Sequence, residues 1–362
     1  MEESRFAPTT DDPAFLAEKY EAEGAHPVGV LRYEWTTRDA DGNRTTGPVI
    51  LKSKTSSTGY KTAMAGVFER QGMRVDGMAD LIGLTDLSMT DVREVEAYRL
   101  LATDEAMAQI APGLLGSYID ESENLYVHLM QPFSNEWLSA VGDLMGWTEQ
   151  NRREVIGQLA ILHGTTLANQ ALVEPLQAVR TGMNLERMGV LAPFWQDAYR
   201  LAARQVGDVL TEDEYEQCGQ ALANWEQRWR EIDATTKCVV HADVQPKNIA
   251  VPADRPPLLF DWEVATVHLP ARDGVEFLIN AAPDSISDVE LNALLEHHRA
   301  EVERISGIEQ PIDRWRRQYE LALDDYQTTR YALYLAIEEV ESHDIHRGQR
   351  ILTRLRRILQ EG

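Results

Sequence analysis

Residues 241–263, HADVQPKNIAVPADRPPLLFDWE, contain three polar residues whose types and spacing suit phosphoryl transfer. Asp243 and Asn248 lie five positions apart, in a segment that contains Pro246 and follows an apolar run, and Asp261 ends the next apolar run. Phosphoryl transfer needs one carboxylate to accept the proton of the attacking hydroxyl. It also needs an amide oxygen and a second carboxylate to hold Mg²⁺ against the phosphates of a nucleotide. The stretch supplies one residue for each of these roles.

The first third of the chain is predicted to supply strands around this chemistry. Residues 28–35 and 48–54 are strand-like, and the Asp, Gly and Asn residues between them are typical of a hairpin connection. Apolar residues at helical spacing predict a helix within residues 88–105. Two further strand-like runs, at residues 114–120 and 124–133, predict a second hairpin.

The remainder of the chain is predicted to be mainly helical. Two short β-like runs, KCVVHAD and PLLFDWE, are embedded among five stretches with helical periodicity. The predicted fold class is therefore α+β, with a small strand-rich lobe at residues 1–134 and a larger helical lobe at residues 135–362. The five helical stretches are residues 148–170, 184–208, 212–232, 287–305 and 311–359.

The motifs resemble those of the aminoglycoside phosphotransferase and choline kinase family. The catalytic loop of that family is typically H-G-D-x-x-x-x-N, and its next strand ends I-D-W or I-D-F; HADVQPKNIAV and LLFDWE match these elements. Four other segments match in the family's order, so that the likeness extends over residues 28–340: VILKSK, REVEAYRLL, LAILHGTTLA and RDGVEFL. The resemblance implies a bilobal protein-kinase-like fold, with a small antiparallel-sheet N-lobe and a larger helical C-lobe, and an enzyme that uses ATP and Mg²⁺.

The resemblance also assigns roles to the three residues of the opening stretch and to the phosphate-binding pair. Asp243 would be the catalytic base, while Asn248 and Asp261 would bind Mg²⁺. Lys52 would bind the α- and β-phosphates of ATP, and Glu94 would pair with that lysine.

Further residues receive supporting roles from the same resemblance. The connection between the lobes would contact adenine through backbone groups of Met130, Gln131 and Phe133. Asp273 and His241 would fix the catalytic loop by hydrogen bonds, and Glu263 is a candidate to assist the metal site.

Some positions leave alternatives open. Lys52 could instead be a solvated strand lysine next to Lys54, and Glu96 lies two positions from Glu94, on a different face of the helix. Ala242 replaces the glycine that usually follows the loop histidine, so the backbone there must be tolerable to a Cβ. The family's phosphate-covering glycine turn has no recognisable counterpart, and His163 is expected to be a packed helix residue.

Composition excludes several classes of function. The formal net charge of −24 argues against a nucleic-acid partner or an anionic membrane. The two cysteines, Cys218 and Cys238, form no zinc-binding pattern and are expected to be reduced structural thiols. The sequence contains neither a signal-peptide pattern nor a membrane-spanning run of apolar residues, so a cytoplasmic location is expected.

Three hypotheses for the function remain at this stage. The first is an ATP-dependent kinase for a hydroxyl of a small molecule such as an amino-sugar, an antibiotic or another natural product. A cationic acceptor would suit the acidic chain, although the charge is spread along its length. The second is a kinase for Ser or Thr of a peptide during natural-product tailoring, and the third is a non-catalytic nucleotide-binding relative.

Overall fold

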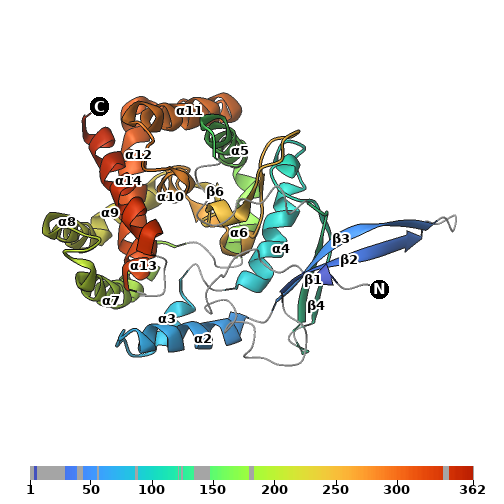
Figure 1. The fold of residues 1–362 in the computed structure, drawn as a ribbon, viewed down its shortest axis with the longest axis horizontal. Helices are drawn as coiled ribbons and strands as arrows, with labels where there is room; N and C mark the ends of the chain where they lie inside the picture. Colours follow the sequence, from blue (N-terminus) through green and yellow to red (C-terminus); the bar gives the residue numbers. More distant parts are fainter. Residues whose placement is uncertain are drawn as a thin grey trace.

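The structure combines an antiparallel sheet at one end of the molecule with a larger group of helices at the other (Figure 1). The sheet carries α4 (Thr90–Leu101) beside it, and the α+β class predicted from the sequence is confirmed. The predicted lobe boundary at residue 134 falls outside the described residues. The computed structural model describes residues 4–5, 29–38, 44–54, 57–85, 89–120, 122–123, 125–133, 147–178, 183–336 and 342–361.

The sheet of the described residues has five strands in the order β1-β2-β3-β5-β4, each pair antiparallel. Both predicted hairpins are confirmed. The first is longer than predicted, because Thr36 and Thr46 continue the pairing and their Oγ1 atoms lie 2.9 Å apart. The strands are β1 (Ser4–Arg5), β2 (Gly29–Arg38), β3 (Arg44–Lys54), β4 (Leu114–Asp120) and β5 (Leu125–Met130).

Two helices lie between β3 and α4, where the sequence patterns predict no element: α2 (Ser57–Arg70) and α3 (Met78–Ile82). Their buried residues share a hydrophobic cluster with α7 (Leu185–Ala202). The ring of Phe68 meets that of Phe194 edge-on, with centroids 5.6 Å apart. This packing joins part of the first 134 residues to the helices of the C-terminal region.

Most of the C-terminal helices follow the predicted stretches, with breaks that the periodicity does not reveal. Two helices, at residues 174–178 and 271–281, lie outside all five predicted stretches. Residues 212–232 are divided at Asn224, and residues 311–359 are interrupted by a π-helical turn, Gln327–Tyr331. Besides α7, the helices are α5 (Glu149–Ala168), α6 (Glu174–Ala178), α8 (Glu212–Ala223), α9 (Trp225–Ala234), α10 (Ala271–Ala281), α11 (Asp288–Ser306), α12 (Ile312–Tyr326), α13 (Ala332–Ala336) and α14 (Ser342–Glu361). Short 3₁₀ turns are Met107–Gln109, Gln170–Leu172, Ala203–Gln205, Pro246–Asn248 and Trp262–Val264.

Two short antiparallel pairs hold the stretch at residues 241–263. β6 (Cys238–Val240) pairs with β9 (Thr266–His268), and β7 (Ile249–Ala250) pairs with β8 (Leu258–Leu259). All residues of these four strands are buried. Val251 and Phe260, which directly follow β7 and β8, are half-buried. The polar loops therefore begin and end at a base of buried strands.

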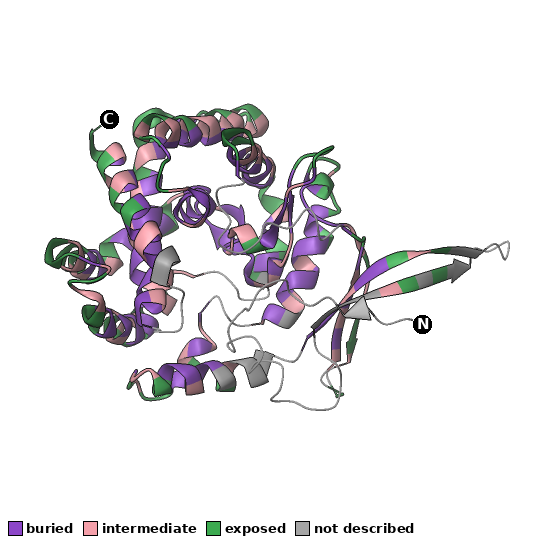
Figure 2. Cartoon of the chain, viewed as in Figure 1, coloured by how far each residue is buried: buried purple, intermediate pink, exposed green. Residues whose placement is uncertain are grey.

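The interior of the helical region is continuous around this base. α10 is buried along nearly its whole length, and in Figure 2 it lies among other buried elements. Because α10 contains Asp273 and Glu276, the core includes ionisable groups that need partners.

No helix in the described part of the chain combines the length and the apolar character needed to cross a bilayer. Both cysteines are buried and unpaired, as predicted for structural thiols.

Candidate active site

The loop between β6 and β7 brings Asp243 and Asn248 into direct contact. The Asn248 Nδ2 donates to the Asp243 backbone oxygen at 3.0 Å and to the Asp243 Oδ2 at 2.7 Å. The Gln245 Nε2 donates to the other carboxylate oxygen at 2.7 Å. Both atoms facing the Asn248 side chain are acceptors, so its Nδ2 faces Asp243 and its Oδ1 faces away. Asp243 is therefore held as an acceptor, and Asn248 keeps one amide oxygen for another partner.

The sequence folds locally in this way because Pro246 begins the 3₁₀ turn that carries Asn248. Proline fixes its φ angle near the value such a turn requires. The Asn248 backbone nitrogen donates to the Gln245 oxygen at 2.9 Å, which closes the turn.

Ala242 occupies a left-handed backbone conformation, with a φ of 61°. This conformation costs a residue with a Cβ about 1–2 kcal/mol, which explains why a glycine suits this position. Asp273 offsets the cost: its Oδ2 and Oδ1 accept from the backbone nitrogens of His241 and Ala242, each at 2.8 Å. The structure thus places Asp273 at the base of the loop, and the His241 ring contacts the Phe260 oxygen at 3.0 Å.

Lys52, Glu94 and Asp261 converge from β3, α4 and the end of β8. The Lys52 Nζ lies 2.8 Å from the Glu94 Oε1 and 2.5 Å from the Asp261 Oδ1. Lys52 is only 7% exposed, so the alternative of a solvated strand lysine is wrong. The other candidate glutamate, Glu96, instead pairs with Arg99 on the surface.

Lys54 belongs to the same cluster, and the sequence reasoning missed its part in it. Its Nζ lies 2.8 Å from the Glu94 Oε2, 2.7 Å from the Glu263 Oε2 and 2.9 Å from the backbone oxygen of Thr90. Residues two apart on a strand point to the same face, so an inward Lys52 implied an inward Lys54. The Glu94 carboxylate is consequently shared between two buried ammonium groups.

The charges around Glu94 determine its protonation. Burial alone would raise the pKa of Glu94, but Lys52 and Lys54 outweigh it and lower that pKa to about 2. His128 lies opposite Lys52 on β5, and burial lowers its pKa to about 4. Glu94 is therefore an anion and His128 a neutral ring at physiological pH.

We expect Lys54→Met to lower the free energy of unfolding by about 3 kcal/mol, because removing one partner of a buried ion pair leaves the other charge uncompensated. Glu263 would lose its contact with Lys54, and Glu94 would keep only Lys52. Urea denaturation followed by tryptophan fluorescence measures the change. The matched control is Lys61→Met on α2, whose side chain is partly exposed; equal stability of both variants would contradict the prediction.

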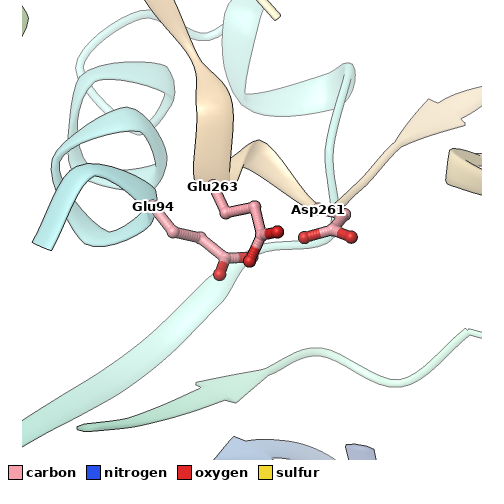
Figure 3. Close-up of side chains that lie close together, drawn as sticks. All are labelled: Glu94, Asp261 and Glu263. Atoms are coloured by element: carbon pink, nitrogen blue, oxygen red, sulfur yellow. The ribbon is translucent and has the colours of Figure 1, made fainter. Parts of the chain in front are cut away.

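Three carboxylates, those of Glu94, Asp261 and Glu263, lie together beside the loop (Figure 3). One oxygen of each lies within 4.8 Å of the others. Glu94 lies between Lys52 and Lys54, whereas Asp261 contacts Lys52 and Glu263 contacts Lys54. Glu94 is therefore the most fully compensated of the three carboxylates, and Asp261 and Glu263 are the better placed to bind a cation. The Phe260 backbone nitrogen donates to the Asn248 backbone oxygen at 3.0 Å, which places Asp261, the next residue, near Asn248. Asp261 itself adopts a φ of 64°. Carboxylate and amide oxygens are the ligands that Mg²⁺ prefers, so the residues fit that ion.

The predicted adenine-contacting segment lies next to this cluster. Met130 is buried at the end of β5, and the Phe133 ring stacks on Phe260 with centroids 5.1 Å apart. The Gln131 backbone nitrogen donates to the Gly113 oxygen at 2.8 Å, which engages one of the backbone donors of this segment. The adenine role of Met130, Gln131 and Phe133 stays a prediction.

The helical region contributes two residues to the loop that the sequence did not indicate. The Arg330 NH2 donates to the Ala242 oxygen at 3.1 Å, and the Tyr334 hydroxyl contacts the Gln245 Nε2, also at 3.1 Å. Arg330 belongs to the π-helical turn, a feature common at functional sites. No motif marks these residues, because they lie nearly 90 positions from the loop.

Glu276 on α10 is a buried carboxyl near the loop. Burial raises its pKa to about 7, although the Arg272 guanidinium, 3.0 Å away, acts in the opposite direction. The folded protein therefore binds this proton more tightly than the unfolded chain does. The contribution of Glu276 to stability is present below its ordinary pKa of 4.5 and is lost as the pH rises to about 7.

We expect Glu276→Gln to remove this pH dependence. The difference in unfolding free energy between the variant and the parent protein should rise by roughly 2 kcal/mol in the variant's favour from pH 5 to pH 8. Urea denaturation at both pH values measures it, with Glu309→Gln, on an exposed residue, as the control. A difference that does not change with pH would contradict the assignment.

One family of known proteins matches more than half of the chain. A family model described as "Phosphotransferase enzyme family" matches residues 92–308. A search of curated protein sequences found no match.

Solved structures resemble the whole chain. A protein from Ralstonia eutropha, provisionally named an aminoglycoside phosphotransferase, is 13% identical, with 96% of this chain and 98% of that chain covered and a TM-score of 0.53. An ethanolamine kinase from Plasmodium vivax is 11% identical, with coverage of 91% and 80% and a TM-score of 0.47. The choline kinase LicA from Streptococcus pneumoniae is 11% identical, with coverage of 90% and 89% and a TM-score of 0.45. The Ralstonia likeness confirms the predicted bilobal fold.

Proposed function

Because the chain belongs to the phosphotransferase enzyme family, we propose that it is a kinase that transfers the γ-phosphoryl group of ATP to an alcohol group of a small molecule. One observation carries the proposal. The contacts of Lys52 with Glu94 and Asp261 join the sheet to the end of β8. β8 pairs with β7, which directly follows the loop on which Asp243 and Asn248 lie side by side. Phosphoryl transfer depends mainly on positioning and on electrostatic stabilisation, and this arrangement provides both.

Asp243 is the proposed base. An alcohol is a poor nucleophile until its proton has an acceptor, and a carboxylate within hydrogen-bond reach serves that purpose. Gln245 and Asn248 donate to the two carboxylate oxygens, which fixes their direction without supplying a positive charge. The acceptor's hydroxyl would donate to one of those oxygens. As the hydroxyl oxygen bonds to the γ-phosphorus, the bond from that phosphorus to the bridging oxygen would break, ADP would leave, and the proton would pass to Asp243.

Lys52 is the proposed phosphate-binding residue. Glu94, an anion buried between two lysines, holds the Lys52 ammonium beside Asp261. The lysine would contact the α- and β-phosphates of ATP, and backbone groups of Met130 to Phe133 would contact the adenine.

Asn248 and Asp261 are the proposed Mg²⁺ ligands, and Glu263 is a third candidate. When bound, Mg²⁺ would neutralise charge on the nucleotide phosphates. The chain's own part is to present oxygens: Asn248 turns its Nδ2 to Asp243, which leaves Oδ1 for the ion.

The experiment that tests the function is transfer of label from γ-³²P-ATP in the presence of Mg²⁺. A panel of acceptors would contain amino-sugars, macrolides, choline, neutral sugars and peptides with Ser or Thr. We expect the label in a small molecule, and much slower transfer by Asp243→Asn. Label found only in a peptide would favour the peptide-kinase hypothesis. Binding of Mg-ATP without turnover of any acceptor would favour a non-catalytic relative.

A further inference from the structure

A line of buried hydrogen bonds connects the candidate catalytic loop to α12. The His163 Nε2 lies 3.0 Å from the Asp273 Oδ2, and the His163 Nδ1 lies 2.9 Å from the His298 Nε2. The His298 Nδ1 lies 2.7 Å from the Tyr319 hydroxyl oxygen. Each of these four residues is at most 1% exposed, so water does not compete for the bonds.

The carboxylate at one end of the line fixes the direction of every bond when both imidazoles are neutral. An ionised Asp273 can only accept, and its pKa lies below the ordinary value because His163 and the loop amides outweigh the effect of burial. His163 must then donate from Nε2 and accept at Nδ1. His298 in turn donates from Nε2, which leaves its Nδ1 to accept from the Tyr319 hydroxyl. Burial also lowers the pKa of His298, so this ring stays neutral.

A glycine makes room for the last member of the line. A Cβ added at Gly274 would lie 2.2 Å from the Tyr319 hydroxyl oxygen, closer than any real contact. The space beside the backbone that follows Asp273 is therefore filled by Tyr319.

We propose that His298 and Tyr319 are positioning residues for the catalytic loop. The effect that this proposal predicts on kcat rests on the proposed function. They act through His163 on Asp273, whose two oxygens hold the left-handed backbone at Ala242. Asp243 is the next residue, so a shift of Asp273 reaches the base directly. Loss of the Tyr319 hydroxyl leaves the His298 Nδ1 without its donor. The His298 ring is then less firmly oriented, and so are His163 and Asp273, which it supports.

The test compares Tyr319→Phe and His298→Gln with His297→Gln, a neighbouring, partly exposed histidine that is outside the line. Tyr319→Phe removes one oxygen and should keep the melting temperature within about 5 °C of the parent protein. We expect its kcat to fall about 10-fold while the KM for ATP stays within about two-fold, as for other residues that orient a catalytic group. His298→Gln should behave alike, and His297→Gln should leave both constants unchanged. A kcat for Tyr319→Phe equal to that of His297→Gln would overturn the proposal, as would parallel losses of kcat and ATP affinity.

Hydrogen exchange of the peptide that covers residues 238–244 supplies a readout that needs no acceptor. Exchange at the backbone nitrogens of His241 and Ala242 should be faster in Tyr319→Phe and unchanged in His297→Gln. Unchanged exchange in both variants would overturn the proposal. If exchange accelerates but no acceptor is phosphorylated, the proposed function fails and the positioning line stands.

A double variant separates positioning from general disruption. Gly274→Ala should lower kcat because its Cβ would lie 2.2 Å from the Tyr319 hydroxyl oxygen. Tyr319→Phe removes that oxygen and leaves the ring Cζ 3.0 Å from the Cβ, a contact that a small shift of the ring relieves. We expect the kcat of Gly274→Ala combined with Tyr319→Phe to lie close to that of Tyr319→Phe alone. Multiplicative losses in the double variant would show that the two residues act independently, against the proposal.

Discussion

Asp243→Asn is expected to lower kcat by roughly 10²–10⁴-fold, the usual contribution of a general base, while the affinity for Mg-ATP stays within about three-fold. The amide is similar in size to the carboxylate but cannot take the proton of the acceptor. The asparagine side chain still offers one oxygen to the amide donors of Gln245 or Asn248, so the loop should keep its backbone conformation. Steady-state kinetics with the acceptor found in the labelling experiment give kcat, and calorimetry gives the affinity.

The control for this variant is Asp254→Asn, on an exposed aspartate between β7 and β8. It changes the net charge by the same amount on the same segment without touching the loop contacts. Asp243→Asn with a kcat equal to that of the control would remove Asp243 from the role of base.

Asp261→Asn is expected to abolish most of the gain in ATP affinity that Mg²⁺ provides, a loss of about 10–100-fold. The change removes an anionic oxygen ligand and also the charge that contacts Lys52 at 2.5 Å. Titration of ATP in Mg²⁺ and in EDTA separates the two effects. The parent protein should bind more tightly with Mg²⁺, and the variant should bind about equally in both.

The two variants together test the division of labour between the two aspartates. Asp243 should affect turnover and Asp261 nucleotide binding. Equal losses of ATP affinity in both would mean that the two carboxylates do not act separately, and a normal Mg²⁺ effect in Asp261→Asn would exclude it as a metal ligand.

The sequence predicted the parts of this site that a local pattern specifies. Asp243 and Asn248 contact each other because the turn that begins at Pro246 brings Asn248 back to Asp243, and Asp261 follows the next buried strand. The lysine–glutamate pair was predictable only through the family resemblance, since Lys52 and Glu94 are 42 positions apart.

Other features depend on packing that no local pattern records. Arg330 and Tyr334 reach the site through elements whose orientation is decided by tertiary contacts. α2 and α3 remained unpredicted for the same reason: their apolar residues form a core only together with α7.

The close approach of Tyr319 to Gly274 constrains how this chain can change by mutation. An enlarged residue at 274 is tolerable only after the ring at 319 has lost its oxygen or become smaller, so the two sites should be substituted together among descendants of one ancestor. Lineages that keep the tyrosine should keep the glycine, and those with a larger residue after the aspartate should have lost the phenol. The residue pairs found at positions 274 and 319 in related sequences would therefore show whether the buried line of hydrogen bonds is retained.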